Sequence, residues 1–141
     1  MQIQPYIIFN GNCEEALNFY AKAFGGEVGS MMRFSDAPPD VQGMSNDNNL
    51  VMHATFQAKG LMFMASDSGQ TAPSAQGGGG GMVHLSINFD NAGELDNVFA
   101  KLSEGGNVTM PLQDTFWGAR FGMLTDRFGV NWMFNHDKGS Q

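Results

Sequence analysis

The chain has 141 residues, of which 42% are hydrophobic and 15% charged, and its net charge is −7 with no cluster of lysine or arginine. A chain of this size can bury one core, but it lacks the basic patch that binding to nucleic acid or to an anionic membrane surface requires. No apolar run approaches the ~20 residues of a membrane span, and the N-terminus lacks a signal-peptide pattern. A single cysteine, Cys13, cannot form an internal disulfide, which favours a reducing cytoplasm.

The first half of the chain predicts a strand, a helix and three further strands. An apolar run over residues 3–9 is rich in β-formers. Residues 13–24 carry one apolar stripe at helical spacing, after a turn that supplies an N-cap and before Gly25-Gly26, which ends the helix. Strands follow at residues 27–34, 50–58 and 61–65, with a polar loop over residues 35–49.

The second half begins after a low-complexity connector that ends in five glycines, residues 77–81. This tract lacks the Lys-Ser/Thr of a phosphate-binding loop and does not open a helix, so it predicts a flexible linker. The next segment, residues 82–90, alternates apolar and polar side chains and predicts a strand with one face on a core. A helix capped by Asn91 and ended by Gly105-Gly106 follows.

The last predicted elements are three strands and a tail. The first, residues 108–115, contains Pro111, which indicates an edge or a bulge. The strands at residues 119–125 and 130–135 are joined by a hairpin turn at 126–129, and residues 136–141 read as a frayed tail.

The two halves are related by a shift of 80 positions. Over residues 9–28, six of 20 positions are then identical, including the glycine pairs that end both helices. This predicts a single α+β domain over residues 1–141, built from two tandem βαβββ modules (1–66 and 82–136) joined by a Gly-rich linker (67–81). The modules would form a curved mixed sheet with the helices on its convex side, leaving a concave cleft for a ligand.

The polar side of the strand at 82–90 faces this predicted cleft. His84, Ser86 and Asn88 lie opposite the Phe89 side, and the shift places Gln4, Tyr6 and Ile8 at the matching positions of the first half. His84 could act as a general base or hydrogen-bond donor to a ligand, or be satisfied by neighbouring strands. His53 lies on the polar face of its own strand and could join His84 across the sheet.

Two motifs carry a resemblance to a known family: Asn-Gly-Asn-Cys-Glu-Glu-Ala at residues 10–16, and a C-terminal block running from Thr115-Phe116-Trp117-Gly118 to Trp132-Met133. With the paired modules, they resemble the vicinal oxygen chelate superfamily, which includes glyoxalase I, bleomycin-resistance proteins and extradiol dioxygenases. The match is closer to its PhnB-like branch, often labelled 3-demethylubiquinone 3-methyltransferase-like. The resemblance covers nearly the whole chain and implies this fold and a homodimer.

The resemblance also implies where a metal would be bound. Metal-containing members place four ligands on the first, fourth, fifth and eighth strands, positions occupied here by Gln4, Met62 or Met64, His84 and Met133. His84 is the only one of these that is a good ligand for a divalent metal, which needs several converging N or O donors. We therefore expect no metal and no other cofactor, the alternative being one divalent metal with an unusual ligand set. A His53/His84 pair would still need a third ligand, such as Asp67 or Gln57.

The remaining candidates are aromatic, polar and basic side chains. Trp117 could wall a small-molecule pocket with Gln113 as a directional contact, or pack a dimer interface, and for Phe116 both roles stay open. Arg120 could hold an anionic ligand or be a surface charge. Asp67 is interpreted as a turn former rather than a base, Cys13 as an inert core thiol and His136 as part of the tail.

These patterns favour a binding protein over an enzyme. We expect a cytoplasmic homodimer that holds a small, partly apolar molecule at His84, His53, Trp117, Gln113, Ser86 and Tyr6, with no nucleic acid or membrane partner. The alternative is a metal-dependent lyase, isomerase or dioxygenase. Methyl transfer is disfavoured because there is no S-adenosylmethionine glycine motif.

Overall fold

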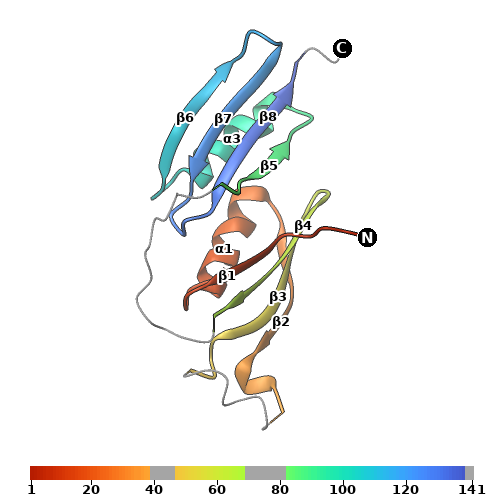
Figure 1. The fold of residues 1–141 in the computed structure, drawn as a ribbon, viewed down its shortest axis with the longest axis vertical. Helices are drawn as coiled ribbons and strands as arrows, with labels where there is room; N and C mark the ends of the chain where they lie inside the picture. The colour runs from red at the N-terminus through yellow and green to blue at the C-terminus, as the bar shows by residue number, and fades with distance from the viewer. Residues whose placement is uncertain (39–46, 69–81, 139–141) are drawn as a thin grey trace. The chain divides into compact units, whose positions relative to one another are not determined.

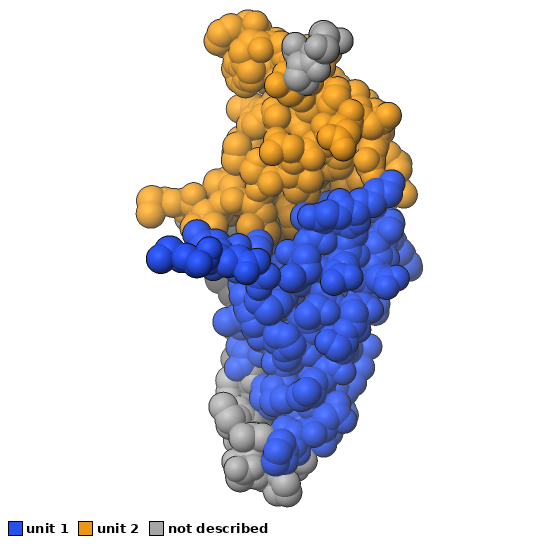
Figure 2. Space-filling model, turned by 90° about the vertical axis from the view of Figure 1, so that its right-hand side faces the viewer, with its two compact units in different colours: residues 1–74 blue, residues 75–141 orange. Residues whose placement is uncertain are grey.

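The computed structural model describes residues 1–38, 47–68 and 82–138. The chain divides into two compact units, residues 1–74 and 75–141, which Figure 2 colours separately. Most of the predicted linker and the middle of the predicted polar loop lie outside the described residues.

Each unit has the order strand, helix, three strands (Figure 1). The first unit contains β1 (Tyr6–Phe9), α1 (Cys13–Phe24), β2 (Glu27–Arg33), the 3-10 helix η1 (Phe34–Asp36), β3 (Val51–Ala58) and β4 (Leu61–Asp67). The second contains β5 (Leu85–Asn88), α3 (Ala92–Leu102), β6 (Asn107–Asp114), β7 (Ala119–Thr125) and β8 (Asn131–Asp137).

The strands form two four-stranded mixed sheets of equivalent order. The first sheet is β1-β4-β3-β2 and the second is β5-β8-β7-β6. In each sheet the first strand runs parallel to its neighbour and the other pairs are antiparallel. The predicted α+β fold of tandem βαβββ modules is confirmed by this matching topology.

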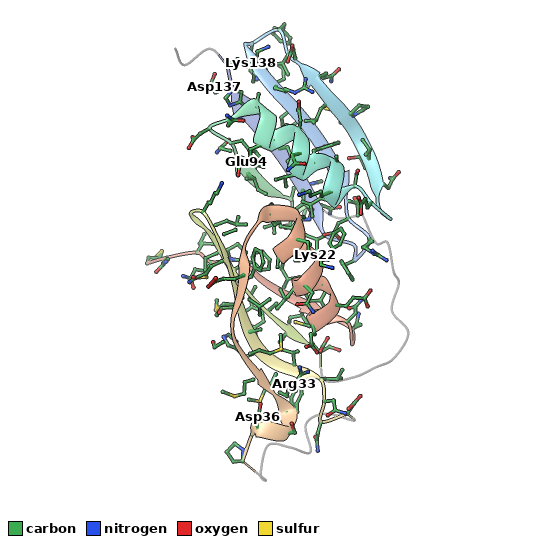
Figure 3. The ribbon with its side chains drawn as sticks, turned by 180° about the vertical axis from the view of Figure 1, so that it is seen from behind. Lys22, Arg33, Asp36, Glu94, Asp137 and Lys138 are labelled. Carbon is green, nitrogen blue, oxygen red and sulfur yellow. The ribbon has the colours of Figure 1, made fainter. Side chains whose placement is uncertain are left out.

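Each sheet buries one face under its own helix, as Figure 3 shows. In the first unit, Tyr20 of α1 is fully buried, with its ring 6.3 Å from that of Phe56 and 5.8 Å from that of Phe63. In the second unit, Phe99 of α3 meets Phe134 of β8 edge to face at 5.0 Å. These contacts fix which side of each strand faces the core.

Asp67, at the end of β4, ties three segments of the first unit together. Its side chain is 5% exposed. One carboxylate oxygen accepts the backbone N–H groups of Gly11 and Cys13, and the other accepts that of Val51, all at 2.9 Å. Asn12 occupies the N-cap position of α1, as predicted, but it makes no side-chain capping hydrogen bond. Asp67 therefore satisfies the start of this helix from a distant strand.

Asp126 plays a similar part in the second unit. It is buried, and its carboxylate accepts hydrogen bonds from the N–H groups of Phe128 at 2.8 Å and Val130 at 3.0 Å. The other carboxylate oxygen accepts the indole N–H of the fully buried Trp132 at 2.8 Å. These bonds close the predicted turn between β7 and β8 and attach it to the core.

The ends of several elements differ from the predictions. β5 begins only at Leu85, where pairing with Trp132 of β8 starts, so His84 lies just before the strand. Residue His136 belongs to β8 and not to a frayed tail, because it pairs with Arg120 of β7, and its Nδ1–H also donates to the Phe89 carbonyl at 2.8 Å. The expected irregularity at Pro111 is confirmed, since the register of the edge strand β6 shifts between Met110 and Gln113.

We predict that Asp67→Asn lowers the free energy of unfolding by about 2 kcal/mol, because an amide cannot accept all three N–H donors and leaves at least one unsatisfied. Urea denaturation checks this, with Asp90→Asn at an exposed position as the control. Equal stability of the two variants would contradict the structural role given to Asp67.

Candidate functional site

The second sheet has one face turned away from α3, which we call the open face of the second sheet. The residues on this face are known from the strand register, since Trp132 and Phe134 point to the core and their neighbours alternate. The strands place the following residues there: Ser86, Asn88, Asn107, Met110, Gln113, Ala119, Phe121, Met123, Thr125, Asn131, Met133, Asn135 and Asp137.

Two rows cross the middle of this face. One row consists of Met110, Met123 and Met133, which lie directly opposite one another on β6, β7 and β8. The other consists of Gln113, Phe121 and Asn135 on the same strands. Directly opposed residues on one face have Cβ atoms about 5 Å apart, so each row forms a continuous strip.

Asparagine side chains extend the second row to the sheet edge. The amide of Asn135 donates to the side-chain oxygen of Asn88 on β5 at 3.1 Å. Both amides keep further donor and acceptor capacity for a bound molecule. Ser86 is exposed and lies directly opposite Met133 in the register of β5 and β8.

Two aromatic residues stand in the turn between β6 and β7. The Trp117 ring lies 6.5 Å from that of Phe121, and the Phe116 ring lies 5.1 Å from that of Trp117. Phe116 is 97% exposed and Trp117 59% exposed. The turn is closed by Thr115, whose backbone N–H and hydroxyl both donate to the Ala119 carbonyl.

The first sheet also has a face turned away from its helix, the open face of the first sheet. Tyr6 of β1 lies opposite Met64 of β4, and Met64 lies opposite Thr55 of β3. The Tyr6 hydroxyl approaches Nδ1 of His53 at 3.4 Å, and the two ring centroids are 5.8 Å apart. Tyr6 therefore reaches across β4 to contact a residue two strands away.

His84 precedes β5 and is partly buried. Its Nδ1 atom is inaccessible to solvent and has no hydrogen-bond partner among the described residues. A buried imidazole nitrogen without a partner is costly, and a hydrogen bond to a ligand atom would remove the cost.

The structure places five of the six predicted site residues in two groups, and His84, which lies just before β5, belongs to neither. Tyr6 and His53 touch in the first unit, as a pair that the sequence pattern alone did not show. Ser86, Gln113 and Trp117 belong to the open face of the second sheet or to its adjoining turn.

Other residues of this face escaped prediction. The sequence pattern predicts that Phe121, Met123 and Asn135 lie in strands but does not predict which way they face. The alternation within residues 119–125 could have supplied that direction once one core residue was known.

Metal donors do not gather within either unit. In the part of the chain that the structure describes, no group of three or more His, Cys, Asp or Glu side chains is placed to hold a metal ion. Of the positions that the family resemblance implied, Met64 lies opposite Tyr6 and Met133 lies opposite Ser86. Thioether sulfurs at these positions suit soft ions rather than the divalent metals of acid–base chemistry.

Arg120 is engaged elsewhere. Its side chain donates to Asp96 of α3 at 2.8 Å and lies 3.5 Å from Asp114 of β6. The hydrogen bond and charge of Asp96 raise the pKa of this guanidinium, and Lys138 together with Arg120 lowers the pKa of Asp114. These ion pairs lie on the helix side of the sheet register, opposite the open face.

Cys13 is fully buried at the start of α1. Burial, the charge of Asp67 and that of Glu14 raise the pKa of its thiol to about 12. This thiol is therefore neutral across the physiological pH range and is a poor nucleophile.

The match to a family model identifies the class of protein. The model for the Glyoxalase/Bleomycin resistance protein/Dioxygenase superfamily matches residues 2–134, so the chain belongs to this superfamily. No helix in the described residues is long and apolar enough to span a membrane.

Individual relatives narrow the resemblance to the PhnB-like branch. Protein YjdN of Escherichia coli K12 is 32% identical over 96% of this chain and 95% of its own length. The crystal structure of protein PA1353 from Pseudomonas aeruginosa is 42% identical, with a TM-score of 0.81 over 97% of this chain and 98% of that one. A PhnB protein from Bacillus cereus, described as a putative 3-demethylubiquinone-9 3-methyltransferase, is 28% identical, with a TM-score of 0.73 over 96% of this chain and 99% of its own.

The raised pKa of Cys13 predicts a pH dependence of stability. The unfolded chain loses the thiol proton near pH 9 and the folded chain near pH 12, so stability is complete below pH 9 and falls as pH rises toward 12. Above pH 9, we expect the free energy of unfolding of the wild type to fall by on the order of 1 kcal/mol per pH unit more than that of Cys13→Ala. Urea denaturation at pH 8 and pH 10.5 measures the difference, and parallel losses in the two proteins would contradict the assignment.

Proposed function

We propose that the protein binds a small, partly apolar molecule without a catalytic metal, as a cytoplasmic homodimer. The observation that carries this proposal is the open face of the second sheet, where apolar and amide side chains lie together without cover from their own helix. Sequestration or delivery of a ligand needs only such a surface, and no reacting group is required.

The chemistry of this face is that of a ligand site. Small-molecule sites are mostly apolar and contain a few polar groups that fix orientation. Phe121 and the methionine row provide apolar area that adapts to the ligand's shape. Gln113 and Asn135, on either side of Phe121, provide directional donors and acceptors.

The open face of the first sheet supports the same proposal with different groups. The Tyr6–His53 pair brings a phenol and an imidazole together beside Met64. Both rings can stack on a flat ligand and both can exchange hydrogen bonds with it. We assign these residues to ligand contact and not to proton transfer.

One observation favours the alternative, a metal-dependent lyase, isomerase or dioxygenase. His84 has an unpartnered buried nitrogen at a position where the resemblance implies a metal ligand. A divalent metal would need two or more further donors, which neither unit gathers in the described residues. The metal-free proposal is therefore preferred.

Methionine methyl groups offer a direct test of binding. We expect a fragment that binds to shift the ¹³C-methyl signals of Met110, Met123 and Met133 while leaving the exposed Met1 unchanged. Phe121→Ala should weaken that binding at least about tenfold by removing buried apolar area. The proposal is contradicted if fragments shift only methionines outside the two open faces.

Elemental analysis of the purified protein separates the two functions. We expect less than about 0.1 equivalent of zinc, nickel, manganese or iron per chain, since a site with one good ligand is too weak to retain a divalent metal. A full equivalent that disappears in His84→Ala but persists in a His136→Gln control would establish the metal enzyme instead.

Association can be measured independently by sedimentation equilibrium. We expect the mass of two chains, about twice 15.3 kDa. A single-chain mass at micromolar concentration would remove the homodimer from the proposal without affecting ligand binding.

A further inference from the structure

Charged residues are absent from the middle of the open face of the second sheet. The chain has 21 charged residues, 7 basic and 14 acidic. Among the strand residues of this face, Asp137 alone is charged, and it occupies the last position of β8 (Figure 3). The rows through Met123 and Phe121 contain only thioether, phenyl and amide groups.

The charges of these same strands are placed on the other side. Arg120 and Asp114, which lie opposite each other on β7 and β6, pair with each other and with Asp96 of α3. Lys138, directly after β8, pairs with Asp114 at 3.1 Å. Neutral side chains on the open face are thus a property of that face and not of the strands as a whole.

The open face of the first sheet follows the same rule. Glu27 is acidic but occupies the first position of β2, at the margin of the sheet. The central positions hold Tyr6, His53, Thr55 and Met64, none of which is an aspartate, glutamate, lysine or arginine.

A neutral surface selects strongly against charged ligands. A ligand charge that leaves water needs a partner of opposite sign, or its desolvation is not offset. The net charge of −7 further repels anions at a distance. An uncharged molecule meets neither obstacle.

We infer that the ligand of the open face is an uncharged molecule with a flat apolar or aromatic body and amide or hydroxyl groups at its rim. This inference rests on the proposed function and adds its ligand class. Methionine sulfur and the Phe121 ring contact the body of such a ligand favourably. Gln113, Asn88 and Asn135 can each donate and accept, which matches an amide or hydroxyl rim.

Three naphthalene probes of equal size test the charge selection. 2-Naphthamide is neutral, 2-naphthoate is an anion and 2-naphthamidine is a cation at pH 7. We expect 2-naphthamide to bind at least about tenfold more tightly than either ion and to shift the methyl signals of Met110, Met123 and Met133. Equal binding of the three probes, or a preference for an ion at these methionines, overturns the neutral-ligand inference and leaves the binding function standing.

A negative charge placed on the face should reduce the selection against the cationic probe. Asn88→Asp keeps an acceptor for the Asn135 amide, so the local hydrogen bond can persist. We expect this variant to gain about tenfold for 2-naphthamidine relative to 2-naphthamide. Asn97→Asp adds the same charge on the exposed side of α3 and should leave the order unchanged. If both variants change the preference between the two probes alike, or neither changes it, the inference fails. If no probe binds to the wild type, the proposed function itself is overturned.

Discussion

Each unit of this protein depends on one buried carboxylate that collects N–H donors from separate segments. Asp67, at the end of β4, joins the start of α1 to the start of β3, and Asp126 joins a turn to the indole of Trp132. A buried carboxylate is tolerated only when its oxygens are well supplied with donors, and here each receives at least three. Loss of one donor set would therefore disturb several elements together.

This arrangement leaves the other face of each sheet free for function. On the open face of the second sheet, the buried Thr125 and Asn131 support the fold, because Thr125 donates to Asn131 at 2.8 Å and Asn131 donates to the Val83 carbonyl at 3.3 Å. The proposed ligand contact uses the other residues of this face. The row through Gln113, Phe121 and Asn135 places one aromatic ring between two amides.

Most of the fold could be predicted from the sequence because local signals are strong. The bounds of α1 follow from its apolar stripe and from Gly25, which adopts the left-handed conformation with φ of 71°. The role of Asp67 could not be predicted, because its donors lie 16 to 56 residues away and no local pattern joins them. The contact between Tyr6 and His53 could not be predicted for the same reason, because 47 positions separate the two residues in the sequence.

The candidate site was predicted only in part for a related reason. Alternation placed Ser86 and Asn88 on the open face correctly, but the strand begins at Leu85, after His84. The start of β5 is set by where its pairing with β8 begins, and the local sequence does not reveal this pairing. The inferred ligand class likewise rests on which side of β6 and β7 the charges occupy, which the strand register shows and the local sequence does not.

A crystal structure of the protein with 2-naphthamide bound would show where the ligand lies. We expect the naphthalene ring to lie against Phe121 and Met123, with its amide bonded to Gln113 or Asn135. A probe bound at the helix side of the sheet, or one held by Arg120 and its acidic partners, would contradict it.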